Sequence, residues 1–77
     1  MQFRVCAINK FNEMVDQPRI IEADTISQAW EEYATGRGLK PEHIDMWWRD
    51  CATISEDQSV ALVSKDEELI VVIMLSS

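Results

Sequence analysis

The uninterrupted apolar run from Leu69 to Leu75 is the feature that most limits how this chain can fold. It reads Leu, Ile, Val, Val, Ile, Met, Leu, with no polar residue in alternation. Such a run is typical of a strand that is covered on both faces or lies at the centre of a sheet, because an exposed edge strand of this kind invites aggregation. The run is far too short to cross a bilayer as a helix, which takes about 20 residues. We therefore expect a sheet with this run as an inner strand.

The N-terminal segment predicts a pair of antiparallel strands. Residues 2 to 9 alternate between two rather apolar faces, which is the period of a strand. Residues 9 to 18 contain Asn, Asp and Pro and are expected to form a loop or the end of a hairpin. Residues 19 to 23 then resume a short β-type run. The simplest arrangement pairs this run with the first strand.

A capping box predicts where the main helix begins. Thr25 opens the sequence Thr-Ile-Ser-Gln, in which the hydroxyl can accept from an early helical N–H and Gln28 can reach back three residues. Gly36 and Gly38 can adopt the left-handed conformation that ends a helix. The residues between them that recur at helical spacing and should face the core are Ile26, Ala29, Trp30, Tyr33 and Ala34.

The segment from 40 to 50 is ambiguous. Pro41 suits the first position of a helix, and the apolar residues that follow fit both a helical face and, through Met46 and Trp48, the alternation of a strand. We expect a helical turn from Pro41 that passes into a strand near Met46 or Trp47, and this strand is expected to continue through Cys51 and Thr53. A polar turn at 56 to 58 precedes a strand at 60 to 63, and a second polar turn at 65 to 67 separates that strand from the apolar run. The tail is therefore expected to be a meander.

These elements predict one α+β domain over residues 1 to 77. The expected architecture is an antiparallel sheet of about four to five strands packed on one main helix, in the order β-β-α-(short helical turn)-β-β-β. One helix cannot cover both faces of such a sheet, so a homodimer that buries the second face is a further hypothesis.

The charge balance indicates the kind of partner. Fourteen acidic residues against seven basic ones leave a net charge of -7, which repels nucleic acid and anionic membrane surfaces. We expect no direct binding to nucleic acid or membranes and favour a basic surface of a protein or nucleoprotein complex. The N-terminus lacks the layout of a signal peptide, so a cytoplasmic protein is expected.

No arrangement of residues predicts catalysis. Cys6 and Cys51 have no metal-ligand spacing and are expected to be buried free thiols, and His43 is the only histidine that could activate either of them. The chain has no GxSxG elbow and no glycine-rich phosphate loop. Adjacent carboxylates do not follow the spacing of a calcium loop. We expect no enzymatic activity, no cofactor and no metal.

The candidate binding residues are acids, together with one tryptophan of a type enriched at binding hot spots. They lie in the predicted main helix, in the ambiguous segment and in the two turns of the meander. The set is Glu31, Glu32, Asp45, Trp47, Asp50, Glu56, Asp57, Asp66, Glu67 and Glu68.

The layout resembles that of small single-helix proteins of phages and mobile elements, including some anti-CRISPR proteins. Two strands lead into a capped helix, written Ile-Glu-Ala-Asp-Thr-Ile-Ser-Gln-Ala-Trp at residues 21 to 30, and a meander follows. The resemblance implies an inhibitor that acts in the host cytoplasm by occupying a surface used for nucleic acid, in some cases through an acidic face that mimics the phosphate backbone. The alternative hypothesis is a homo-oligomeric structural or accessory assembly protein that uses its apolar last strand and its tryptophans.

Overall fold

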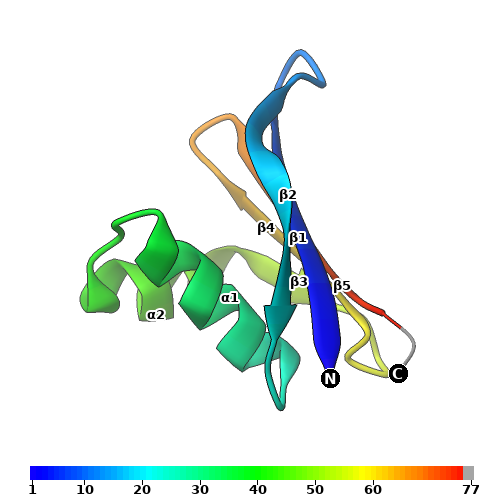
Figure 1. Cartoon of the computed structure of the whole chain (residues 1–77). Coiled ribbons are helices and arrows are strands. Elements are labelled where there is room, and N and C mark those ends of the chain that lie inside the picture. Colours follow the sequence, from blue (N-terminus) through cyan, green and yellow to red (C-terminus); the bar gives the residue numbers. More distant parts are fainter. Residues whose placement is uncertain (76–77) are drawn as a thin grey trace.

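The computed structural model describes residues 1 to 75 and has the predicted α+β architecture, with a five-stranded antiparallel sheet and two helices (Figure 1). The strand order in the sheet is β2-β1-β5-β4-β3. Both helices lie on the same side of the sheet. The elements are, in chain order, β1 (Gln2–Asn9), β2 (Met14–Glu22), α1 (Ile26–Gly36), α2 (Pro41–Cys51), β3 (Ala52–Ile54), β4 (Val60–Lys65) and β5 (Glu68–Met74).

The apolar run forms the central strand, as its composition predicts. β5 pairs with β1 on one side and with β4 on the other, so every strand position in it is flanked by neighbours. Ile70 and Val72 face the helices and are almost completely buried. Leu69, Val71 and Ile73 alternate with them and face the opposite side of the sheet, where they are only half-buried.

The second strand begins earlier than the sequence predicts. Residues 14 to 18 were expected in a loop, but β2 starts at Met14 and includes Pro18. A proline lacks the N–H that an inner strand must donate, yet β2 is an edge strand and can accommodate it. The register with β1 shifts near Ala7, where the pairing is irregular. Only the short connection between Asn9 and Met14 is therefore a loop.

Helix α1 begins at the predicted cap. The Thr25 hydroxyl accepts a hydrogen bond from the Gln28 backbone N–H at 3.2 Å. The Gln28 side chain reaches back one residue further than a standard capping box, because its Oε1 accepts from the Asp24 N–H at 3.0 Å. Gly38 has a φ of 85° and turns the chain away after the helix, whereas Gly36 is still its last residue.

The segment after α1 is a full helix, which corrects the expected change to a strand near Met46 or Trp47. Helix α2 extends from Pro41 to Cys51, and the strand begins only at Ala52. The sequence fits the period of a helix and that of a strand, and long-range packing selects the helix. The Trp30 indole Nε1 donates a hydrogen bond to the backbone oxygen of Ile44 at 3.1 Å. The apolar residues of α2 at helical spacing thus face α1 and the sheet.

Three tryptophans hold the two helices together. Trp30 is 1% exposed, and its ring stacks on Trp47 at a centroid distance of 6.4 Å and on Trp48 at 6.2 Å. Such aromatic contacts add roughly 0.5 to 1.5 kcal/mol each beyond the area that they bury. Small residues allow the close approach of helix and sheet, because Ala7, Ala29 and Ala61 are completely buried between them.

Replacing Trp30 tests this arrangement. We expect Trp30→Ala to lower the free energy of unfolding by about 3 to 5 kcal/mol, because it leaves a cavity beneath α2. Trp30→Phe should lose less, since most of the ring volume remains. Urea unfolding followed by circular dichroism measures both, with Phe11→Ala as the control because Phe11 is 69% exposed. Equal losses at Trp30 and Phe11 would contradict the packing described above.

Candidate interaction surfaces

The structure distributes the predicted acidic residues over several parts of the molecule. Glu31 and Glu32 are exposed on α1, and Asp45 and Asp50 are exposed on α2. The two acidic turns lie at opposite ends of β4, one before Val60 and one after Lys65. A strand of this length separates them by about 20 Å. Figure 1 shows the β3–β4 loop at the lower end of the sheet and the β4–β5 turn at the upper end.

Several of these carboxylates are already paired with a cation of the same chain. Glu67 lies 3.2 Å from the Lys10 ammonium, and Asp50 lies 3.4 Å from the Arg49 guanidinium. Glu68 pairs with Arg37 in a partly buried contact. Hydrogen bonding to Glu68 is the main cause that raises the pKa of Arg37, so the contact favours the charged guanidinium. These acids are less available to a partner than acids without a cation.

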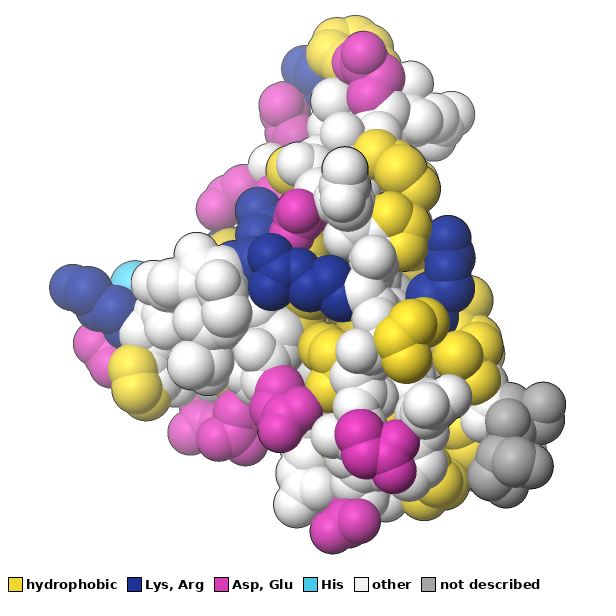
Figure 2. All heavy atoms as spheres, viewed as in Figure 1, with side chains coloured by type: hydrophobic (Ala, Val, Ile, Leu, Met, Phe, Trp, Pro, Cys, Tyr) yellow, Lys and Arg dark blue, Asp and Glu magenta, His cyan; other side chains and the backbone are white. Residues whose placement is uncertain are grey.

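The α1 acidic surface, defined here as Asp24, Glu31 and Glu32, has a different character. Among the ion pairs of residues 1 to 75, none involves these three carboxylates. Residues 20 to 36 contain no Lys or Arg. In the space-filling view, Asp and Glu side chains gather along the lower part of the molecule, over α1 and the turn before it (Figure 2).

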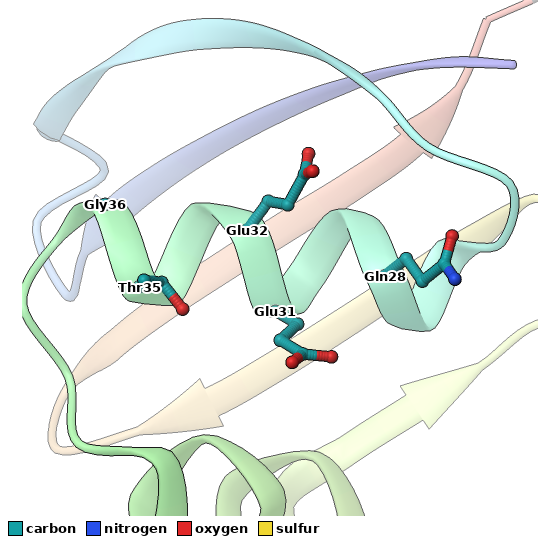
Figure 3. Close-up of a pocket in the computed structure, with 5 residues that line it drawn as sticks. All are labelled: Gln28, Glu31, Glu32, Thr35 and Gly36. Carbon is teal, nitrogen blue, oxygen red and sulfur yellow. The ribbon is translucent and has the colours of Figure 1, made fainter.

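The two glutamates flank a shallow, open hollow on the outer side of α1 (Figure 3). Gln28, Thr35 and Gly36 complete its lining. Glu32 points toward β2 and Glu31 points toward α2, so their carboxylates diverge from the helix. This geometry suits contacts with cations spread over a broad surface, and it does not converge on a point as a metal or catalytic site would.

A pair of arginines borders this surface. The guanidinium carbons of Arg19 and Arg37 lie 5.5 and 5.7 Å from the centre of the Tyr33 ring, and Arg19 also pairs with Asp16 at 3.0 Å. Burial raises the pKa of the Tyr33 hydroxyl above its ordinary value of 10.0, and Arg37 partly offsets this effect. The sequence did not predict this cluster, because its members are brought together from β2, α1 and the segment after it.

Trp47 is a weaker candidate for partner binding than the sequence suggested. Its ring is half-buried and stacks on Trp30. The Lys65 ammonium lies 6.0 Å from the centre of the same ring, near the limit for a cation–π contact. The side chain therefore has a structural role in attaching α2, with only part of its surface open to solvent.

Asp57 has a structural role in the β3–β4 loop. Its Oδ1 accepts hydrogen bonds from the Ser59 hydroxyl at 2.7 Å, from the Ser55 hydroxyl at 2.8 Å and from the Ser59 N–H at 3.1 Å. These hydrogen bonds, those from Ser59 foremost, lower the pKa of Asp57 below its ordinary value of 3.8. Glu56 precedes it and is exposed.

The side of the sheet that faces away from the helices is a second candidate surface. Within residues 1 to 75, no helix lies over it. Figure 2 shows hydrophobic side chains running down the strand side of the molecule. We call this surface the open face, and its apolar residues are Cys6, Ile8, Met14, Ile20, Val60, Leu62, Leu69, Val71 and Ile73.

The remaining chemistry-bearing residues include two cysteines, and the described part of the chain brings together no group that could hold a metal ion. Cys6 and Cys51 are free, as expected, but both are half-buried and not buried. Cys6 lies on the open face, and Cys51 ends α2. Residues 1 to 75 contain no group of three or more His, Cys, Asp or Glu side chains that could hold a metal ion. Neither helix in this range is long and apolar enough to cross a bilayer.

Comparisons with models of known protein families, with curated proteins and with solved structures found no match to this chain. The structure offers two surfaces for binding. One is a charged helix surface without paired cations, and the other is an apolar sheet face.

The role of Asp57 predicts a pH dependence of stability. Because its pKa is lowered by folding, its contribution is complete above the unfolded value and is lost as pH falls through the folded value. We expect Asp57→Asn to destabilise the protein at about pH 5, with the difference from wild type disappearing toward about pH 2. Glu56→Gln is the matched control, since it removes the same charge from the same loop. A difference for Asp57→Asn that is constant with pH would contradict this role.

Proposed function

We propose that this protein is a non-enzymatic acidic binding protein, and that it inhibits a nucleic-acid-handling complex by occupying a basic surface of that complex. The observation that carries the proposal is the α1 acidic surface. Its carboxylates are exposed and lack a cationic partner among the ion pairs of the described residues, and those of Glu31 and Glu32 stand on a helix fixed by the contacts of buried Trp30. A surface that normally binds phosphates offers the Lys and Arg residues that such carboxylates attract.

The rigid position of the acids supports binding in this manner. Trp30 and Tyr33 anchor α1 from beneath, while Glu31 and Glu32 project from its outer side. Side chains on a fixed helix need less ordering on binding than side chains in a mobile loop. Charges of this kind mainly raise the association rate, and their effect weakens as salt screens them.

The acids of the two turns have a smaller share in the proposed binding. Glu67 and Glu68 are engaged by Lys10 and Arg37, and Asp57 organises its own loop. Asp45 on α2 is exposed and can extend the contact beyond α1. The proposed contact therefore centres on Asp24, Glu31 and Glu32.

Displacement of labelled DNA from purified RNA-guided defence complexes tests the proposal. We expect wild-type protein to displace DNA from at least one complex, and the Glu31→Gln, Glu32→Gln double variant to need roughly tenfold more protein, since each exposed ion pair contributes about 0.2 to 1 kcal/mol. The inhibition should decrease steeply as salt is raised. Fluorescence anisotropy of the labelled DNA is the readout.

A second double variant, which removes the same amount of charge elsewhere, shows whether a loss of inhibition is specific to α1. The Glu13→Gln, Asp66→Asn double variant removes the same charge from loops at the other end of the sheet, and asparagine tolerates the positive φ of 52° at residue 66. If both double variants lose inhibition equally, only net charge matters and the α1 surface is not the contact. If no complex is inhibited by wild-type protein, the proposed target class is wrong.

The open face favours a second candidate function, that of a structural or accessory assembly protein. Its side chains are apolar, so association through it should persist at high salt, unlike binding through the carboxylates. The tryptophans do not belong to this surface, because they pack between the helices on the other side of the sheet.

A further inference from the structure

The apolar residues of the open face form a continuous patch across four strands. The pairing places Arg4 between Ile20 and Ile73, with Val60 beyond them. The next row along the strands contains Cys6, Val71 and Leu62. A third row contains Met14, Ile8, Leu69 and Ser64. Ile20 and Met14 are 57% and 58% exposed, and they extend the patch to the edge of the sheet, where a contiguous apolar surface marks a site of interaction.

Charge is segregated away from this patch. The three rows contain none of the fourteen acidic residues of the chain, and Arg4 is their only charged residue. The long stem of Arg4 can lie along the apolar surface while its guanidinium reaches the rim. Two copies with a net charge of -7 each repel one another, and the open face is where they can meet without bringing carboxylates together.

The edges of the sheet are poorly suited to association by strand addition. β2 carries Pro18 and an irregular register with β1, and β3 is only three residues long. Both features hinder pairing with another chain. Contact between faces is therefore favoured over contact between edges.

The size of the patch is sufficient for a dimer. Four strands and three rows of side chains give a footprint of about 19 by 20 Å. Two such faces bury roughly 800 Å² in total, which is below the standard size of a specific interface and suits a weak, reversible dimer. A symmetric dimer uses the same patch on both copies, so one apolar face is sufficient for both sides of the interface.

We propose that the open face binds the open face of a second copy of this chain, giving a homodimer with two sheets inside and the helices outside. The arrangement covers the second face of β5 and leaves the α1 acidic surface of each copy exposed. It does not depend on the function proposed for that surface.

Sedimentation velocity of wild-type protein over a wide range of concentration tests the dimer. We expect a monomer–dimer equilibrium with a Kd on the order of micromolar, as suits a small interface. The dimer fraction should increase at high salt, because screening weakens the repulsion between the copies while apolar contacts persist. A mass of 8.9 kDa at every concentration and both salt levels would overturn the proposal.

Leu62 and Ile54 provide a matched pair of variants. Each is 39% exposed, but Leu62 lies on the open face, and Ile54 pairs with Ala61 on the side of the helices. We expect Leu62→Lys to raise the dimer Kd at least tenfold and Ile54→Lys to leave it nearly unchanged, with circular dichroism verifying that both fold. Equal effects of the two lysines would show that the open face is not the interface. Measuring DNA displacement by the Leu62→Lys monomer tests the α1 surface separately, because this variant changes the open face alone.

Cys6 gives an independent measure of burial. It lies in the middle row of the open face, so the proposed dimer covers it. In a Cys51→Ala background, labelling of Cys6 by a maleimide should slow as the dimer fraction rises with concentration, and Leu62→Lys should abolish this protection. A dimer in solution that leaves the labelling rate of Cys6 unchanged would use a different surface and contradict the proposal.

Discussion

The position of α2 depends on Trp30. This side chain comes from α1, is buried beneath α2, and donates a hydrogen bond to the Ile44 carbonyl while Trp47 and Trp48 stack on its ring. In a chain this small, one such cluster is a large share of the total stability, which is typically about 0.05 to 0.15 kcal/mol per residue. The orientation of α1, and with it the placement of its carboxylates, rests on the same contacts.

Local signals in the sequence were sufficient for the elements that depend on local chemistry. The capping residue Thr25 predicted the start of α1, and the apolar composition of residues 69 to 75 predicted a central strand. The expected change to a strand within residues 41 to 51 was wrong, because the apolar residues there satisfy both periods and the choice is made by Trp30, which lies elsewhere in the chain. Pro18 was misleading for a similar reason, since its tolerance in β2 follows from the edge position of that strand.

The candidate surfaces were less predictable than the fold. The residues that neutralise the turn acids are distant in sequence, with Lys10 and Glu67 57 positions apart and Arg37 and Glu68 31 positions apart. Composition alone therefore overstates how much of the negative charge is available for binding. The acids of α1 have no partner among the ion pairs of residues 1 to 75, and the absence of Lys and Arg between residues 20 and 36 is a signal that could have been found without the structure.

Neighbouring residues along β5 serve two different purposes, since one set packs in the core and the other set forms the surface on the opposite side of the sheet. Ile70 and Val72 fill the space beneath the helices, so their shape is fixed by the packing of the core. Leu69, Val71 and Ile73 face away from the helices, so substitutions there change the surface and leave the helix contacts intact. Evolution can thus alter what this sheet binds by changing every second residue of one strand, while the residues between them preserve the same fold.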